Sequence, residues 1–365
     1  MSTPDHKFYN AFNLIPQMGP LRFKKLQIYF DTMENAWNAG LGEYEKAGLE
    51  KNVIGKIIQF KKEISPEKEF EKLEKEGIKI VTTNDGLYPE LLGEIHTAPA
   101  LLYYKGEIKK EVVAIAIVGS RKVSTYGRQV TSQLARELSQ AGLLIVSGMA
   151  LGIDGIAHRE CLKLKNKTIA ILGGGIDTNS IYPSSHYQIA EEIISSGGAI
   201  VSEYPVGTPP LKQHFPARNR IISGLSLGIL VIEAAESSGS LIIAKFALEQ
   251  NREVFAIPGS IYSPTSKGSN NLIRLGAKLV TKAEDILEEL NLESAIEIKK
   301  AREIIPDNKE EALILKNLHP DEPIHIDQLA KIIKMNVTAI SSLLTLMEIK
   351  GKVKNVGGMK YIKES

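Results

Sequence analysis

The sequence predicts an α/β fold in which a mainly parallel sheet lies between a small helical domain and a second small domain. Eight short apolar runs, rich in β-branched residues, predict the strands of this sheet: residues 78–83, 112–119, 143–148, 168–174, 199–204, 228–234, 253–259 and 278–281. Stretches with helical periodicity separate most of these runs from residue 112 onward. Because the runs are apolar throughout, we expect strands that are buried on both faces, as in a parallel sheet covered by helices.

The 365 residues are enough for two or three domains. The N-terminal region alternates apolar and charged positions at helical spacing, and its turns fall at residues 18–20, 38–43 and 64–69. The C-terminal region predicts three helices and then a β-hairpin around Gly357-Gly358, an order typical of a winged-helix module. The predicted division is a helical domain, a sheet domain, a charged linker and a winged-helix-like domain, over residues 1–75, 76–290, 291–308 and 309–365.

Composition limits the classes of function. The chain has 45 basic and 43 acidic residues, so any cationic binding surface must be local and offset by acidic surface elsewhere. Cys161 is the one cysteine, which excludes an intrachain disulfide and a cysteine metal cluster and indicates a reducing compartment. The N-terminus lacks the pattern of a secretory signal, and no apolar run reaches the roughly 18 residues that span a bilayer. We therefore expect a cytoplasmic protein with no membrane association.

Small polar loops, most of them rich in glycine, follow six of the predicted strands. In chain order they read GSRKVSTYGRQ, SGMALGIDGIAH, GGGIDT, VGTPPLKQHFPARNR, AESSGSL and GSIYSPTSKGSNN. In open parallel sheets, ligands bind outside the carboxyl ends of the strands, where helix N-termini favour phosphate. The sequence therefore predicts either a long anion-binding groove or one deep nucleotide pocket at this edge.

The fourth of these loops combines cations with an aromatic residue. Lys212, Phe215, Arg218 and Arg220 lie at a predicted corner between a strand and a helix. Arginine offers a planar fork to phosphate, and an exposed phenylalanine offers a face on which a base can stack. This mixture suits single-stranded nucleic acid better than a mononucleotide. The alternative, left open by residue type alone, is that Phe215 anchors the core and the arginines pair with nearby acids.

Several catalytic motifs are missing or incomplete. The sequence has no GxxxxGK[ST] phosphate loop and no GxSxG elbow, which argues against ATP hydrolysis of that type and against a serine hydrolase. GGGIDT resembles a dinucleotide fingerprint only weakly, because Thr178 stands where the third glycine belongs. Asp154 and His158 lie four residues apart on a predicted helix, where a catalytic or metal role competes with a capping Asp154 and a hydrogen-bonded structural His158.

A series of longer motifs runs in order across about residues 110–285: GSRKVSTYG (119–127), SGMALGIDGIAH (147–158), GGGIDTNSIYP (173–183), SEYP (202–205), FPARNRIISGLS (215–226), EAAESSGSL (233–241) and IPGS (257–260). This series closely resembles the bacterial DNA-processing protein A (DprA/Smf) family. The resemblance implies an extended Rossmann-like domain. It also implies an N-terminal helical domain similar to a sterile-alpha-motif (SAM) fold and a C-terminal winged-helix-like domain.

The resemblance also implies roles for individual residues in binding single-stranded DNA. By motif position Arg121 is the main phosphate-binding residue, Lys212 contacts the DNA backbone and Phe215 stacks against a base. Glycine and serine residues line the groove through amides and hydroxyls: Gly119, Ser120, Gly148, Gly239 and Ser240. Arg218, Asn219 and Arg220 match the RNR of the family, and either contact with DNA or bracing of the loop remains open for the arginines.

As a member of this family the protein is expected to be a non-enzymatic single-stranded DNA-binding protein without a cofactor or catalytic metal. The resemblance implies that it protects incoming single strands during natural transformation, forms a homodimer and loads the RecA recombinase onto DNA that single-strand-binding protein otherwise occupies. The competing hypothesis is a nucleotide-processing enzyme of the related phosphoribohydrolase-like class. Glu233 and Glu236 are its candidate acids, although the PGGxGTxxE stretch of that class is missing.

The two end domains carry weaker signals. The predicted last helix of the winged-helix-like domain, residues 337–351, has a polar face of Thr338, Ser341, Ser342 and Thr345, and the wing offers Lys352, Lys354 and Lys360. These side chains offer few groups for sequence-specific contacts to the bases of a duplex. A role of this domain in binding a protein is therefore at least as well favoured as a role in binding duplex DNA. Near the N-terminus PQMGPLRFKKL resembles a helix-hairpin-helix turn, with Arg22, Lys24 and Lys25 as candidate backbone contacts, although a solvated helix face is the favoured interpretation.

Overall fold

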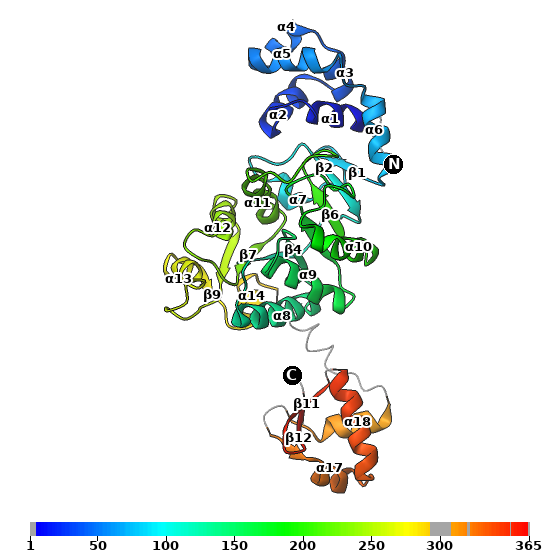
Figure 1. The fold of residues 1–365 in the computed structure, drawn as a ribbon, viewed down its shortest axis with the longest axis vertical. Helices are drawn as coiled ribbons and strands as arrows, with labels where there is room; N and C mark the ends of the chain where they lie inside the picture. The colour runs from blue at the N-terminus through cyan, green and yellow to red at the C-terminus, as the bar shows by residue number, and fades with distance from the viewer. Residues whose placement is uncertain (1–4, 293–307, 320–321, 351, 364–365) are drawn as a thin grey trace. The chain divides into compact units, whose positions relative to one another are not determined.

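The computed structural model describes residues 5–292, 308–319, 322–350 and 352–363, whose contacts divide the chain into two compact units (Figure 1). The first unit is Met1–Leu292 and the second is Glu293–Ser365. Most of the predicted linker, residues 293–307, lies outside the described residues. The division of the first unit into a helical and a sheet domain at residue 75 stays a prediction.

The N-terminal region is helical, as predicted. Its helices are α1 (His6–Asn13), α2 (Pro20–Tyr29), α3 (Met33–Asn38), α4 (Leu41–Lys46), α5 (Lys51–Phe60) and α6 (Pro66–Lys75). The three predicted turns separate α1 from α2, α3 from α4 and α5 from α6. Thr32 and Ser65 cap α3 and α6 by accepting hydrogen bonds from backbone N–H groups of the first turn. The indole of Trp37 meets the ring of Phe12 edge-on at 5.0 Å between centroids, inside the core of this region.

The first unit contains, within the described residues, a nine-stranded sheet in the order β1-β2-β6-β5-β4-β3-β7-β8-β9. The strands are β1 (Lys79–Thr82), β2 (Leu101–Gly106), β3 (Ala114–Val118), β4 (Leu144–Ser147), β5 (Thr168–Ile171), β6 (Ala199–Ser202), β7 (Gly228–Val231), β8 (Glu253–Ala256) and β9 (Lys278–Leu279). In this sheet order, each strand from β6 through β5, β4, β3, β7 and β8 to β9 pairs in parallel with the next. Strand β2 is antiparallel to both β1 and β6. The mainly parallel sheet is therefore confirmed, and each of the eight predicted runs contains one strand.

Strand β2 is the strand of this sheet that the sequence analysis missed. Its first four residues, Leu101–Tyr104, are all buried, so the segment shows no alternation of polar and apolar positions. A short apolar run of this kind is compatible with a strand or with a buried turn of helix. Its antiparallel pairing with β6, whose residues lie almost a hundred positions further along the chain, is decided by the sheet as a whole.

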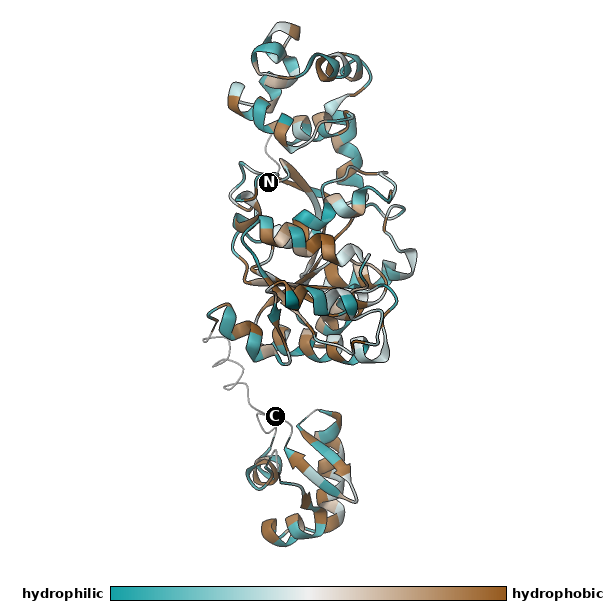
Figure 2. Ribbon diagram, turned by 90° about the vertical axis from the view of Figure 1, so that its left-hand side faces the viewer, coloured by the Kyte–Doolittle hydropathy of each residue, from teal (hydrophilic) through white to brown (hydrophobic). Residues whose placement is uncertain are grey.

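Helices cover both faces of the sheet, and Figure 2 shows the strands as a largely hydrophobic layer between them. The covering helices include α8 (Thr125–Gln140), α9 (Ile153–Lys163), α10 (Tyr187–Ser195), α11 (His214–Gly224), α12 (Gly239–Glu249), α13 (Lys267–Arg274) and α14 (Ala283–Glu289). Alternate strand residues belong to different core clusters: on β6, Ile200 packs in one, whereas Ala199 and Val201 pack in the other. This confirms that the strands are buried on both faces, which explains their unbroken apolar runs.

The second unit has the elements of a winged helix. Its helices are α16 (Lys309–Lys316), α17 (Ile326–Ile333) and α18 (Val337–Ile349), and its strands are β10 (Ile324–His325), β11 (Val353–Gly357) and β12 (Lys360–Lys363). The predicted hairpin turn is confirmed, with Gly357 and Gly358 at φ of +97° and +59°, values that glycine adopts without strain. Strand β10 was not predicted. Among the described residues no single helix is long and apolar enough to cross a membrane, and α17 with α18 passes only as a pair bent by 111°.

The N-terminal helices and the sheet share one continuous core, and Tyr103 joins them. Its fully buried phenol on β2 donates a hydrogen bond to Asn10 Oδ1 (2.8 Å) and accepts one from Asn13 Nδ2 (3.2 Å), both on α1. The same core cluster contains residues of the N-terminal helices, such as Phe12, and residues of the sheet, such as Ile200.

Tyr103→Phe is therefore expected to lower the free energy of unfolding by about 1–3 kcal/mol, because it leaves the buried amide of Asn10 without its partner. Urea denaturation of the full chain measures this change. Tyr29→Phe is the matched control, since Tyr29 is 42% exposed, and it should be neutral. Equal stability of the Tyr103→Phe and wild-type proteins would contradict the proposed link.

Candidate nucleic-acid interface

A surface pocket of about 840 Å³ lies at the carboxyl ends of five strands that are adjacent in the sheet, β6, β5, β4, β3 and β7. Four strand spacings of about 4.8 Å give it a span of about 19 Å along the sheet edge. Most of its lining comes from the loops and helix starts that follow these strands: Pro210, Lys212 and Phe215 after β6, Tyr182 after β5, Ala150 and Asp154 after β4, Gly119–Lys122 after β3, and Ala235 and Ser237–Ser240 after β7. We call this pocket the groove.

One end of the groove lies at the topological switch point of the sheet, between β3 and β7. Strands β3 and β7 are parallel neighbours, but the chain continues from β3 to β4 on one side and from β7 to β8 on the other. The connections therefore leave in opposite directions and open a crevice, the usual ligand site of such sheets. The loop after β3 brings Arg121 to this crevice, and the loop after β7 brings Ser238 and the N-terminus of α12.

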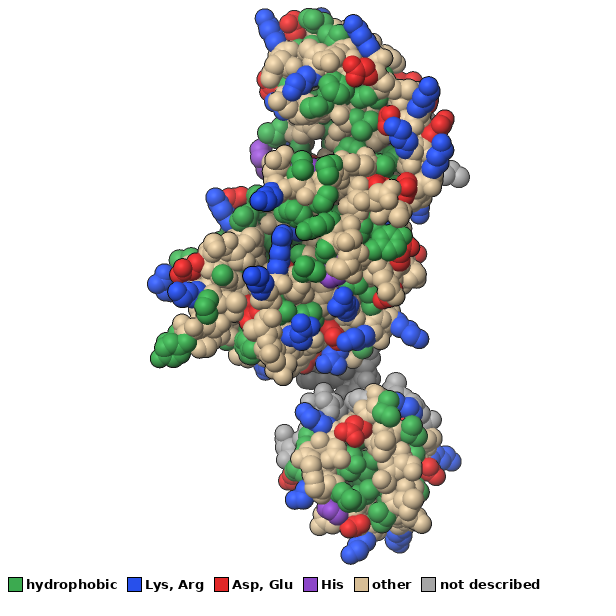
Figure 3. Space-filling view, in the orientation of Figure 1, with side chains coloured by type: hydrophobic (Ala, Val, Ile, Leu, Met, Phe, Trp, Pro, Cys, Tyr) green, Lys and Arg blue, Asp and Glu red, His purple; other side chains and the backbone are tan. Residues whose placement is uncertain are grey.

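The groove contains nine of the eleven predicted site residues: Gly119, Ser120, Arg121, Lys212, Phe215, Arg218, Asn219, Gly239 and Ser240. Gly148 and Arg220 do not line it. Figure 3 shows Lys and Arg side chains on the face of this unit that carries α11 and α12, although the net charge of the chain is only +2. The sequence thus correctly predicted which loops come together, because the carboxyl ends of parallel strands share one sheet edge.

Arg121 and Phe215 form a pair. The guanidinium carbon of Arg121 lies 5.2 Å from the centroid of the Phe215 ring, within the range of a cation–π interaction. Arg121 and Lys212 are exposed, and Phe215 is partly buried beside Gly173, where any side chain would crowd the ring. An exposed cation held over an aromatic ring can meet a phosphate and a base in the same place.

Arg218 is a buried cation in the groove floor. Its side chain is almost completely covered, and its guanidinium donates to the carbonyl of Gly148 (2.6 Å) and to the carbonyl of Ile171. A Cβ at position 148 would collide with this guanidinium, which explains the glycine there. Burial lowers the pKa of Arg218 to about 10, so the group remains charged at neutral pH. Burial also raises the pKa of Asp154, against the opposing effect of the Arg218 charge.

The two other residues of the RNR motif hold the loop in place. Arg220 makes a two-pronged ion pair with Glu203, with Nη2 2.5 and 2.7 Å from the two carboxylate oxygens. Asn219 donates to the carbonyl of Gly239 at 3.4 Å and so connects α11 to the start of α12. Both side chains are buried. Of the two interpretations that the sequence left open for the arginines, this geometry favours bracing for Arg220.

Glu233 is engaged elsewhere than in the groove. Its buried carboxylate accepts hydrogen bonds from the Ser124 backbone (3.0 Å), the Ser124 hydroxyl (2.5 Å) and Thr265 (3.3 Å). Gly127 has no room for a side chain because this carboxylate lies against it. Glu236 is exposed. Neither acid is among the described residues that line the groove, so the geometry gives no support to the hydrolase hypothesis.

Asp154 and His158 are structural in this geometry. Asp154 accepts a hydrogen bond from the Ala150 backbone at 3.3 Å. The Thr168 hydroxyl donates to the Ile145 carbonyl, so it accepts from His158 Nδ1, 2.8 Å away. Complete burial lowers the pKa of His158 to about 3. Within the described residues, no three His, Cys, Asp or Glu side chains gather as metal ligands.

Sequence reasoning missed Lys122, Tyr182 and Thr265 as lining residues of the groove. Lys122 and Tyr182 stand inside the motifs GSRKVSTYG and GGGIDTNSIYP, so their place in loops after strands was the available signal. Tyr182 is half exposed, and its ring lies beside Phe215 with 6.0 Å between centroids.

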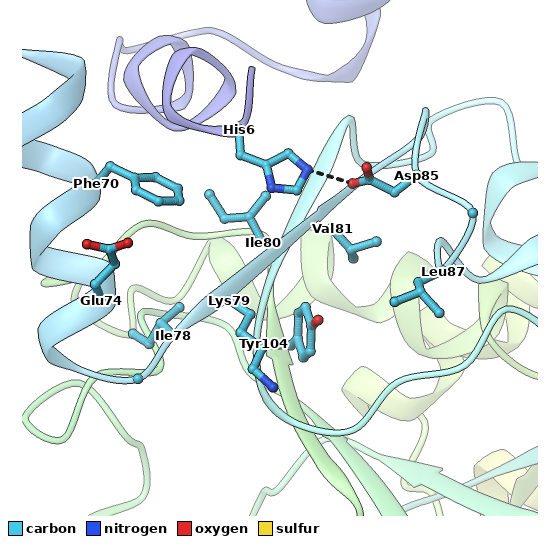
Figure 4. A pocket seen from close by; sticks show the side chains of 12 residues that line it. His6, Phe70, Glu74, Ile78, Lys79, Ile80, Val81, Asp85, Leu87 and Tyr104 are labelled. Carbon is cyan, nitrogen blue, oxygen red and sulfur yellow. Dashed lines mark hydrogen bonds and ion pairs between the residues drawn. The ribbon is translucent and has the colours of Figure 1, made fainter. Parts of the chain in front are cut away.

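A second pocket, of about 600 Å³, lies along the free edge of β1 and differs in chemistry (Figure 4). Phe70, Ile78 and Ile80 make much of its lining apolar, and His6 is hydrogen-bonded to Asp85 at 2.8 Å. It contains none of the predicted site residues. The candidate nucleic-acid interface is therefore the groove.

The fold and the groove define a class, the Rossmann-like α/β proteins with a cationic crevice at the switch point of a parallel sheet. Comparison with known proteins identifies the family. Residues 79–291 match the family model described as DNA recombination-mediator protein A, and residues 299–359 match the DprA winged helix domain. The chain belongs to the DNA recombination-mediator protein A family, also called DprA/Smf, whose role is in DNA processing and recombination.

Relatives match over different lengths. Protein Smf of Synechocystis sp. is 33% identical over 99% of both chains, and DNA processing protein DprA of Bacillus subtilis is 45% identical over 59% of this chain and 72% of its own length. The crystal structure of DprA from Streptococcus pneumoniae superposes with a TM-score of 0.66 at 36% identity, covering 79% of this chain and 99% of that one. A DprA structure from Helicobacter pylori, described for its single-stranded DNA binding mode, covers 59% of this chain and 97% of its own at TM-score 0.53 and 32% identity.

The pKa of His158 generates a prediction for stability against pH. The folded state holds this imidazole neutral down to about pH 3, whereas the unfolded chain takes up the proton near pH 6.5. As pH falls through this window the unfolded state binds more protons, so His158 lowers the free energy of unfolding by up to about 1.4 kcal/mol per pH unit. Urea denaturation of the wild type and His158→Gln at pH 7, 6 and 5 tests this, and the wild type should lose stability more steeply. Parallel curves would show that His158 does not control this loss.

Proposed function

We propose that this protein binds single-stranded DNA in the groove without catalysing a reaction on it. The observation that carries the proposal is the placement of the Arg121 guanidinium over the Phe215 ring in the same pocket as the exposed Lys212. Unpaired strands expose phosphates and base faces together, whereas a duplex keeps its base faces stacked inside. A groove that offers cations and aromatic rings side by side fits the unpaired strand.

The electrostatics of the groove support the same ligand. Arg121, Lys122 and Lys212 are exposed cations, and Arg218 adds a buried positive charge to the floor. Gly239 and Ser240 open helix α12, whose N-terminal dipole favours a phosphate. The described single-stranded DNA binding mode of the H. pylori relative adds independent support.

We further propose the cellular role that the family resemblance implies. In this role the protein, in the cytoplasm, protects incoming single strands during natural transformation. It forms a homodimer and loads the RecA recombinase onto DNA that single-strand-binding protein otherwise covers. The groove supplies the DNA contact, and other surfaces supply the protein contacts. Light scattering of the purified protein tests the homodimer.

The salt dependence of DNA affinity distinguishes phosphate contacts from base stacking in the groove. Each phosphate contact to a single strand contributes about −0.7 to the slope of log affinity against log salt concentration. We expect Arg121→Ala to make the slope of oligo-dT binding shallower by about this amount. Phe215→Ala should weaken binding by ~1–3 kcal/mol with an unchanged slope, because base stacking releases no counterions. Mobility-shift titrations over a salt series measure both effects.

Arg136→Ala is the matched control for these titrations. Arg136 is an exposed arginine near the far end of α8, and it is outside the groove lining. It should bind oligo-dT like the wild type. If Arg121→Ala, Phe215→Ala and Arg136→Ala all bind like the wild type, the groove is not the DNA site.

Recombinase loading is tested with purified components. On single-stranded DNA covered by single-strand-binding protein, the wild-type protein should accelerate growth of the RecA filament, followed by RecA ATP hydrolysis. Arg121→Ala should reduce this acceleration because it holds the strand more weakly. A wild-type protein that binds oligo-dT tightly but leaves the filament rate unchanged would retain the DNA-binding proposal and exclude the loading proposal.

A further inference from the structure

Tyr182 is the most exposed aromatic side chain that lines the groove. It follows β5 and precedes the short helix Ser184–His186, and its side chain is 50% exposed. Its ring centroid lies 6.0 Å from that of Phe215, with the two ring planes inclined at 52°. The two rings therefore lie side by side in the groove wall.

The faces of Phe215 are less available than those of Tyr182. The Arg121 guanidinium lies over the Phe215 ring at 5.2 Å, the buried Arg218 guanidinium lies 6.0 Å from its centroid, and the backbone of Gly173 approaches its edge. A base that enters the groove beside these rings thus meets the more open ring of Tyr182, in addition to the part of the Phe215 ring that the cations leave free. Sequence reasoning, which considered one platform at Phe215, did not include this second ring.

The loop that carries Tyr182 is held rigidly. The carboxylate of the buried Asp177 accepts hydrogen bonds from the Gly207 N–H (2.8 Å) and the Ser180 hydroxyl (2.9 Å). Ile181 and Pro183, on either side of the tyrosine, are buried. Among the described residues the Tyr182 hydroxyl has no hydrogen-bond partner. The fold therefore fixes the flanking chain and leaves the tyrosine ring open to solvent, which reduces the entropy lost on binding.

We propose that Tyr182 is a second base-stacking residue of the groove, which holds one unpaired base against its ring beside the Arg121–Phe215 pair. This inference rests on the proposed function of the groove and specifies part of its ligand, a stretch of single strand whose base is turned toward the protein. Phosphate contacts alone hold the backbone of any nucleic acid, whereas the tyrosine ring selects for an accessible base face.

The test compares two probes, oligo-dT and an oligonucleotide of the same length made of abasic residues. Tyr182→Ala should weaken oligo-dT binding by about five- to 140-fold, the range for one stacked base. It should leave binding of the abasic probe unchanged, because that probe has no base to stack. Tyr182→Phe should bind both probes like the wild type, since the hydroxyl takes no part. The salt slope of Tyr182→Ala should equal that of the wild type.

Tyr187→Ala is the matched control, because Tyr187 is 38% exposed and is not a lining residue of the groove. Equal weakening of both probes by Tyr182→Ala would overturn the proposal and assign Tyr182 a purely structural role. Binding of oligo-dT by Tyr182→Ala at wild-type strength would also overturn it, while Arg121→Ala in the same assay shows separately whether the groove binds DNA. Tyr182→Phe, which preserves the packing of the ring, keeps the test informative if Tyr182→Ala folds poorly.

Discussion

The groove depends on one buried interaction, the guanidinium of Arg218 bound to the carbonyls of Gly148 and Ile171. Gly148 directly follows β4 and Ile171 ends β5, so a single side chain fastens the second turn of α11 to the carboxyl ends of two central strands. Phe215, one turn earlier, is thereby held opposite Arg121. Losing both carbonyl contacts would take from a buried cation the hydrogen bonds that its guanidinium makes here, a loss that proteins tolerate poorly.

Charge in this protein is organised locally. Three acidic side chains near the groove are buried or paired: Glu203 pairs with Arg220, Glu233 binds Ser124, and Asp154 is buried and feels the charge of Arg218. The exposed side chains that line the groove include the cations Arg121, Lys122 and Lys212 and the ring of Tyr182, beside the aliphatic Ile242. A chain with almost balanced charge can therefore present a positive surface to a phosphate backbone, and screening weakens such exposed contacts as salt rises.

The same arrangement gives Glu233, the candidate acid of the hydrolase hypothesis, a structural position. A hydrolase needs an acid or base that reaches the reacting atoms. Here the candidate Glu233 joins the cap of α8 to the loop at Thr265, which makes it part of the scaffold that shapes the groove. The chemistry that remains at the groove surface is suited to holding a strand. This agrees with membership of a family of recombination mediators.

The sequence by itself determined the parallel core strands, the helical N-terminus, the hairpin of the C-terminal unit and the loops that meet at the groove, because strand runs, helical periodicity and Gly-Gly turns are local patterns. Only the tertiary structure decided the rest. β2 was missed because an antiparallel insertion between β1 and β6 is a long-range pairing. Arg218 and Arg220 look like surface cations in sequence, and Tyr182 looks like any loop tyrosine. Their burial or exposure depends on residues distant in the chain, which local pattern cannot reveal.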